Sequence, residues 1–188
     1  MNTRAIALLT LSLLPFLPRQ ESPAQGVTST ILEAEGDELV LVQEAWFDAP
    51  VADLWRAYTT AEGMRSWAAP AAEVDLRIGG EIRTNYLPGK KVGEEGTNTV
   101  HVLAYVPERL LTLRAEPSPL WPESLRAEAD RFSNVILFEA LGDERSHVVS
   151  YGIGYRDVEE HRKLLEFFLP ANEGLLRTLQ QVLAAEDD

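Results

Sequence analysis

LWRAYTTAEGMRSW at residues 54–67 and VDLRIGGE at residues 74–81 decide the fold of this chain. Apolar residues in and just before the first segment recur at helical spacing: Val51, Leu54, Trp55 and Tyr58. Pro50 suits the first position of that helix. Thr59–Glu62 has the spacing of a capping box, which predicts a second short helix ending near Trp67.

The second segment predicts a strand, Val74–Ile78, that ends at a double glycine, Gly79–Gly80. Phosphate-binding glycines are followed by a helix and, in the nucleotide loops, by Lys-Ser or Lys-Thr. Neither follows here. The two glycines therefore predict a sharp kink with positive φ between two strands.

Strand-like runs fill most of the remaining chain. They are Leu39–Phe47 before the helix pair and, after the double glycine, Glu81–Leu87, Thr97–Val106, Leu110–Ala115, Asn134–Leu141 and His147–Tyr155. Most breaks between the later runs have hairpin length, and no crossover helices separate them, so an antiparallel meander is predicted. The long irregular stretch Ala115–Ser133 is the exception.

The C-terminal segment predicts helices over Val158–Leu169 and Ala171–Leu183, interrupted by Pro170. Their apolar residues form one broad face that can pack on a sheet. The whole order is one strand, a helix pair, a strand meander and a long C-terminal helix.

In that order, and in its turn residues, the chain resembles the START-like superfamily (birch-pollen-allergen-like, SRPBCC). Within it, the chain is similar to the branch of the activator of heat-shock-protein-90 ATPase. The resemblance rests on Asp48–Pro50, Thr59–Trp67, Asp75–Gly80, Pro107–Leu111 and, more weakly, Glu173–Leu179. It implies an α+β helix-grip fold: a curved antiparallel sheet wrapped around the C-terminal helix, with two short helices after the first strand. Such a fold encloses an apolar cavity, so the resemblance implies a ligand-binding role.

Composition excludes several other functions. With 17 basic and 30 acidic side chains the net charge is −13, which argues against nucleic acid as a partner. The absence of cysteine excludes disulfides, thiol nucleophiles and Cys-based zinc sites. Three scattered histidines with no H-E-x-x-H spacing favour neither a metal nor another cofactor.

Residues 1–24 have the pattern of a signal peptide. Arg4 precedes an apolar run, Ala5–Leu14, and Ser22 and Ala24 supply small residues before a cleavage site. An uncleaved segment that tethers the chain to a membrane is the alternative, and membrane contact is expected only there. We expect an exported protein, periplasmic or secreted, with a linker over residues 25–37 and one domain over residues 38–185.

Two strand residues are candidate acids or bases. Glu139 shares a strand face with Val135 and Leu137, and an inward-facing carboxylate among apolar residues would have a raised pKa. His101 lies in the middle of a predicted strand and could also point inward. The alternatives are an exposed edge charge at Glu139 and an ordinary sheet histidine at position 101.

Aromatic residues flank the predicted cavity and are candidate ligand contacts: Trp67, Tyr86, Trp121, Phe138, Tyr151 and Phe168. Pockets for small molecules are mainly apolar and aromatic, with a few polar groups that fix orientation. The hydroxyls of Tyr86 and Tyr151 are the candidate orienting groups. Trp121, with Phe132, is expected either to form a lid or to anchor the long loop.

Three functions are compatible with this cavity. The preferred one is the binding of a small apolar or amphipathic molecule. The second is an enzyme of cyclase, dehydratase or hydrolase type that uses an acid or base in the cavity. The third is a co-chaperone-like protein partner, which export disfavours.

Overall fold

The computed structural model describes residues 26–117 and 121–185. The expected signal segment at residues 1–24 lies outside this part of the chain, as do three residues of the stretch Ala115–Ser133. No helix in the described ranges is long and apolar enough to cross a membrane.

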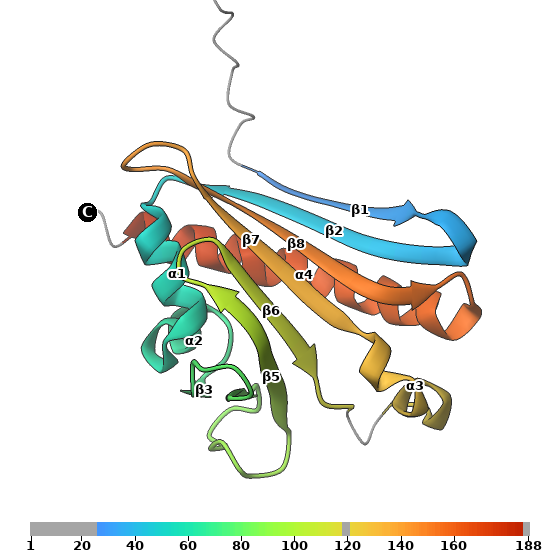
Figure 1. Ribbon diagram of the computed structural model, residues 1–188. Helices are drawn as coiled ribbons and strands as arrows, with labels where there is room; N and C mark the ends of the chain where they lie inside the picture. The colour runs from blue at the N-terminus through green and yellow to red at the C-terminus, as the bar shows by residue number, and fades with distance from the viewer. Residues whose placement is uncertain (1–25, 118–120, 186–188) are drawn as a thin grey trace, which may run out of the picture.

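The described ranges form eight strands and four α-helices (Figure 1). In chain order the elements are β1 (Val27–Glu33), a 3₁₀ turn (Glu35–Asp37), β2 (Glu38–Phe47), α1 (Val51–Thr59), α2 (Ala61–Trp67), β3 (Ala71–Val74), β4 (Glu81–Asn85), β5 (Thr97–Val106), β6 (Leu110–Ala115), α3 (Glu123–Ala127), a second 3₁₀ turn (Ala129–Arg131), β7 (Ser133–Ala140), β8 (Ser146–Arg156) and α4 (Glu159–Ala185).

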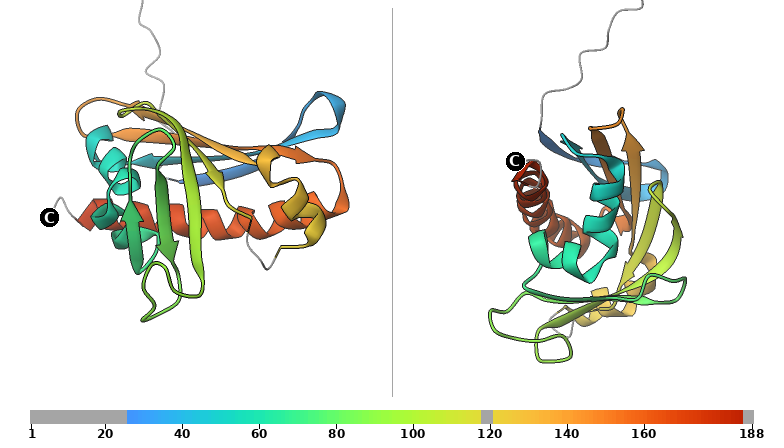
Figure 2. Two further views of the ribbon diagram at one scale, coloured as in Figure 1. Left: turned by 60° about the horizontal axis from the view of Figure 1, so that its bottom comes forward. Right: turned by 90° about the vertical axis from the view of Figure 1, so that its left-hand side faces the viewer.

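All strands belong to one antiparallel sheet in the order β1-β2-β8-β7-β6-β5-β4-β3. The N-terminal strand β2 therefore lies beside the last strand β8, with Gln43 opposite Ser150. The sheet curves, and α4 runs along its concave side, while α1 and α2 close one end (Figure 2). The helix-grip fold expected from the sequence is confirmed.

Two hydrophobic clusters hold α4 against the sheet. The first, here called the α1 cluster, joins the C-terminal half of α4 to α1 and to the sheet; its members include Leu54, Trp55, Tyr58, Phe138, Leu176, Leu179 and Leu183. The second, the α3 cluster, surrounds the N-terminal half of α4; its members are Leu39, Leu41, Leu125, Phe132, Tyr155, Leu164 and Leu165. Between these two clusters, pockets remain between the sheet and α4.

One sequence expectation is wrong at the N-terminal side of the domain. Residues 27–33, expected within a linker, form β1 and pair with β2 from Val27 opposite Ala45 to Glu33 opposite Leu39. Their small and polar residues suit an edge strand, which is buried on only part of its surface. The ordered domain therefore begins before residue 38.

The predicted strand Val74–Ile78 is also wrong, because the strand β3 ends at Val74. The following residues form a tight turn, in which Asp75 N–H donates to Glu81 O and Gly80 N–H donates to Arg77 O. Gly79 has φ +77°, as the double glycine predicted. The turn is fastened to β5 because Gly79 N–H donates to Val102 O.

The two predicted C-terminal helices are one continuous helix, α4, with Pro170 inside it. Proline removes one hydrogen bond from a helix interior, but the apolar contacts on either side hold both halves in line on the sheet. The helix pair α1–α2 is as predicted, with its cap one residue later than expected. Thr60, rather than Thr59, accepts the hydrogen bond from Gly63 N–H at 3.0 Å.

Candidate ligand-binding groove

The concave face carries two adjoining pockets between the sheet and α4. The larger has a volume of about 190 Å³ and is lined by residues of β2, β5, β6, β7, β8 and α4 together with Trp121 and Phe132. The smaller has a volume of about 110 Å³ and adds Tyr58, Trp67, Ile136, Leu175 and Leu176. Four residues line both pockets: Gln43, Asn134, Ser150 and Asn172. We call these four the polar row, and the two pockets together the groove.

Gln43 is the centre of the polar row and is 1% exposed. Its Nε2 donates to Leu169 O at 3.2 Å and to Ser29 Oγ at 3.0 Å. Its Oε1 accepts from Asn172 Nδ2 at 2.8 Å. The side chain thus connects β1 and α4 to β2 next to Pro170. A buried amide is stable only when its polar atoms have hydrogen-bond partners, and these contacts supply them.

The other half of the row crosses the sheet from β8 to β7. Ser150 stands opposite Gln43 in the strand register, and its Oγ donates to Asn134 Oδ1 at 2.9 Å. Apolar walls flank the row on both sides. On the α3-cluster side the wall includes Leu41, Phe132 and Phe168, and on the α1-cluster side it includes Ile136 and Leu176.

The groove carries no ionised group among the described residues. The described lining contains no Asp, Glu, Lys, Arg or His, and its only titratable side chains are two tyrosines. Burial raises the pKa of Tyr155 to about 12 and raises the pKa of Tyr58 further still. Both tyrosines are therefore neutral at physiological pH, and the groove offers only apolar surface and neutral hydrogen-bonding groups.

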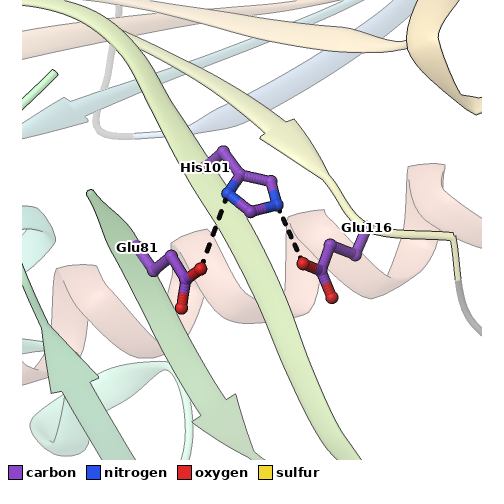
Figure 3. A group of neighbouring side chains, drawn as sticks. All are labelled: Glu81, His101 and Glu116. Atoms are coloured by element: carbon purple, nitrogen blue, oxygen red, sulfur yellow. Dashed lines mark hydrogen bonds and ion pairs between the residues drawn. The ribbon is translucent and has the colours of Figure 1, made fainter. Parts of the chain in front are cut away.

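The candidate base His101 does not reach the groove. It faces the convex side of the sheet, where Nε2 lies 2.9 Å from Glu116 Oε1 and Nδ1 lies 3.8 Å from Glu81 Oε1 (Figure 3). His101 therefore belongs to an exposed cross-strand pair network rather than to the cavity.

Glu81, His101 and Glu116 are the one group among the described residues whose side chains could approach a metal ion together. However, the two carboxylates face opposite ring nitrogens of His101. A single ion can bind only one of those nitrogens, so at most one of the two carboxylates lies beside the nitrogen that would bind the ion.

Glu139 also faces away from the groove. Its side chain is 63% exposed and lies 3.6 Å from His147 Nδ1 on the convex face. The strand β7 is apolar on both faces, and Phe138 decides which one is inward: its ring packs edge-on against Trp55 at 5.2 Å and Tyr58 at 5.3 Å. The neighbouring Glu139 must then point outward, so it is not an acid or base of the groove.

The six candidate ligand contacts divide into two groups. Trp67 lines the smaller pocket, while Trp121 and Phe168 line the larger one. Phe138 is buried in the α1 cluster behind Tyr58. Tyr86 follows β4 and is 47% exposed, and Tyr151 lies opposite Val42 and Val135 on the convex face.

Tyr86 and Tyr151, whose hydroxyls were expected to orient a ligand, line neither pocket; the polar side chains that line both are those of the polar row. Trp121 is held in place in the described part of the chain, since it packs edge-on against Phe132 at 6.2 Å and Phe132 packs against Tyr155 at 5.0 Å. Sequence reasoning missed the polar row, although one signal was present. Gln43 alternates with Leu39, Leu41, Ala45 and Phe47, so it is the only polar residue on the buried face of β2.

Comparisons with known proteins identify a family and agree with the fold. The sequence model of the family described as "Activator of Hsp90 ATPase homolog 1-like protein" matches residues 48–185. No curated protein matches the chain.

Several solved structures share the fold. Protein MLL2253 from Mesorhizobium loti is 18% identical with a TM-score of 0.61, over 78% of this chain and 97% of that one. Protein NE0264 from Nitrosomonas europaea is 17% identical with a TM-score of 0.58, over 82% and 99%. CalU16 from Micromonospora echinospora is 18% identical with a TM-score of 0.55, over 85% and 75%. At these identities the likeness establishes the fold alone.

Proposed function

The chain belongs to the family of Activator of Hsp90 ATPase homolog 1-like proteins, and from that starting point we propose that its concave groove binds a small apolar or amphipathic molecule. The observation that carries the proposal is the pair of adjoining pockets between the sheet and α4, which are lined by apolar side chains and crossed by a row of neutral polar groups. Ligand pockets typically have this composition.

Binding is preferred over catalysis because no carboxylate, histidine or lysine lies among the described residues of the groove. Cyclases, dehydratases and hydrolases of the type considered need a group that exchanges a proton near neutral pH. The candidates for that role, Glu139 and His101, lie on the convex face. Among the described residues that line the groove, only tyrosines with raised pKa values are titratable.

A titration with the neutral fluorescent probe N-phenyl-1-naphthylamine tests the proposal. Saturable binding with a rise in fluorescence is expected for the wild type. Ala115 lines the larger pocket, and Ala115→Phe should fill it and weaken binding by about tenfold or more, because the added ring occupies the probe's place.

Ala140→Phe is the matched control, because Ala140 is an exposed strand residue outside both pockets. This variant should bind the probe like the wild type. Equal binding by the wild type and Ala115→Phe, or no binding by the wild type, would refute the groove as the ligand site.

We also propose that the protein acts outside the cytoplasm. The support is the sequence pattern of residues 1–24. Mass spectrometry of the protein recovered from the periplasm or medium of its host should show a chain that begins at Gln25. Arginine at both Leu8 and Leu9 should block export, since it interrupts the apolar run. A full-length chain found only in the cytoplasm would contradict the proposal.

A further inference from the structure

We propose that the ligand of this groove is electrically neutral and carries a group that both accepts and donates a hydrogen bond, such as a carboxamide or a hydroxyl, which Asn134 and Asn172 recognise. This inference rests on the proposed function. It goes beyond it by naming the chemistry of the ligand and the two residues that select it.

The orientations of the Gln43 and Asn172 side-chain amides follow from Leu169 O, a partner that can only accept a hydrogen bond. Leu169 O is a backbone carbonyl, so the atom of Gln43 that faces it must be the donor Nε2. Gln43 Oε1 then points to Asn172, which must donate through its own Nδ2. The remaining atom of the Asn172 amide, Oδ1, makes no hydrogen bond within the described chain and is an acceptor available to the groove.

Asn134 supplies the complementary group. Its Oδ1 accepts the hydrogen bond from Ser150 Oγ. Its Nδ2 has no partner within the described ranges, although Asn134 lines both pockets. The polar row therefore offers one donor from β7 and one acceptor from α4 at the junction of two apolar pockets.

A ligand that covers such an amide without completing its hydrogen bonds loses binding free energy. A half-satisfied polar group that a ligand covers costs about 1–3 kcal/mol. A bound carboxamide or hydroxyl can accept from Asn134 Nδ2 and donate to Asn172 Oδ1, so it removes this penalty at both residues. A hydrocarbon of the same shape would leave both groups unpaired.

Charge separates the remaining ligand classes. An ionised ligand group would be desolvated in the groove with no opposite charge beside it, since the described lining is neutral. The net charge of −13 adds a long-range repulsion against anions. Fatty acids and other carboxylates are therefore disfavoured relative to neutral amides and alcohols.

Calorimetric titration with three ligands that share one ring system tests the inference: 2-naphthamide, 2-naphthoate, which is ionised at pH 7, and 2-methylnaphthalene. The wild type should bind the amide about tenfold or more tightly than the hydrocarbon, which corresponds to two net hydrogen bonds. It should bind the carboxylate more weakly than either.

Asn134→Leu keeps the shape of the side chain and removes its donor. The variant should lose about fivefold in affinity for the amide and keep its affinity for 2-methylnaphthalene. Asn98→Leu is the matched control, because Asn98 is exposed and lines neither pocket. It should bind all three ligands like the wild type.

The outcomes separate this inference from the proposed function. Carboxylate binding as tight as amide binding, or equal affinity of the wild type for amide and hydrocarbon, would overturn the inference and leave a groove that binds apolar ligands. An unchanged amide preference in Asn134→Leu would overturn the role of that residue. Failure of all three ligands to bind would overturn the proposed function itself.

Discussion

Asn85 is a fully buried amide that organises the loop between β4 and β5. Its Nδ2 donates to Lys91 O and Glu95 O, both at 3.0 Å, and its Oδ1 accepts from Leu87 N–H. Asn85→Ala would leave these three backbone groups without their side-chain partner and should lower the free energy of unfolding by about 2–3 kcal/mol, because three hydrogen bonds are lost together. Urea denaturation measures the change.

Asn98→Ala is the control for this substitution, because Asn98 is exposed. Its effect should stay within about 0.5 kcal/mol. Equal effects of the two substitutions would show that the hydrogen bonds of Asn85 do not hold the loop.

His161 should make the stability of the fold fall in mild acid. The side chain is 2% exposed, and its Nδ1 accepts from Arg156 N–H at 2.8 Å. Burial lowers the pKa of His161 below its ordinary value of 6.5, despite the opposing effect of Glu128. The unfolded chain thus binds more protons just below that pH, so the contribution is complete above pH 6.5 and is lost as the pH falls below it.

The melting temperature between pH 7.5 and pH 5.5 measures this loss. Glu128, Glu160, Arg131 and Arg156 are the charged groups that act on His161. His161→Gln keeps an acceptor for Arg156 N–H and cannot be protonated in this range, so its melting temperature should fall less steeply than that of the wild type. Parallel pH profiles of the two proteins would contradict the role of His161.

The residues that face the groove were only partly predictable from the sequence. Trp67, Trp121 and Phe168 line the pockets because large apolar side chains beside a cavity pack into it. For Glu139 and His101 the sequence left both an inward and an outward side chain open. Both faces of β5 and β7 carry apolar residues, so the alternation could not say which face is inward. That choice depends on the tertiary contacts of Phe138 with α1.

At the scale of elements, the two glycines of the β3–β4 turn have different roles. Gly79 needs its left-handed φ of +77°, but a Cβ there would meet no atom within 4 Å. A Cβ on Gly80 would lie 2.2 Å from the backbone oxygen of Asp75. Gly79→Ala should cost about 1 kcal/mol of stability and Gly80→Ala about 3 kcal/mol, since only the second displaces backbone.

Thermal or urea unfolding of both alanine variants checks this order. Gly89→Ala is a control for positive φ outside this turn, because Gly89 has φ +76° and open space around its Cβ position. It should resemble Gly79→Ala. A larger effect at Gly79 than at Gly80 would contradict the account of the turn.

The continuity of helix α4 cannot be predicted from local sequence signals alone. Pro170 predicted a break, and on local grounds an interior proline costs about 3 kcal/mol. The structure keeps the helix continuous because Leu164 and Leu165 pack on the α3 cluster while Leu176 and Leu179 pack on the α1 cluster. Gln43 contacts Leu169 O beside the proline. The helix thus stays continuous because of contacts that include β2, which is far from Pro170 in the sequence. The residues next to Pro170 in the sequence do not reveal these contacts.

At the scale of the whole molecule, the strands before the family match complete the groove. The match begins at residue 48, yet β2 supplies Leu41 and Gln43 to the larger pocket. The strand β1 in turn covers β2, since Ser29 Oγ accepts from Gln43 and Ile31 packs against the α3 cluster. The sequence placed the domain boundary at residue 38, which separates β1 from the strand that it stabilises.

A chain that begins at residue 38 should therefore be less stable than one that begins at residue 26. The shorter chain loses the packing of Val27 and Ile31, together about 2–3 kcal/mol of burial. It also exposes β2 as an unpaired edge that can associate with other chains. Urea unfolding with light scattering should show a lower midpoint and more aggregation for the shorter chain. If instead residues 25–37 act as a linker, the two chains will unfold at the same urea concentration and the sheet will not need its first strand.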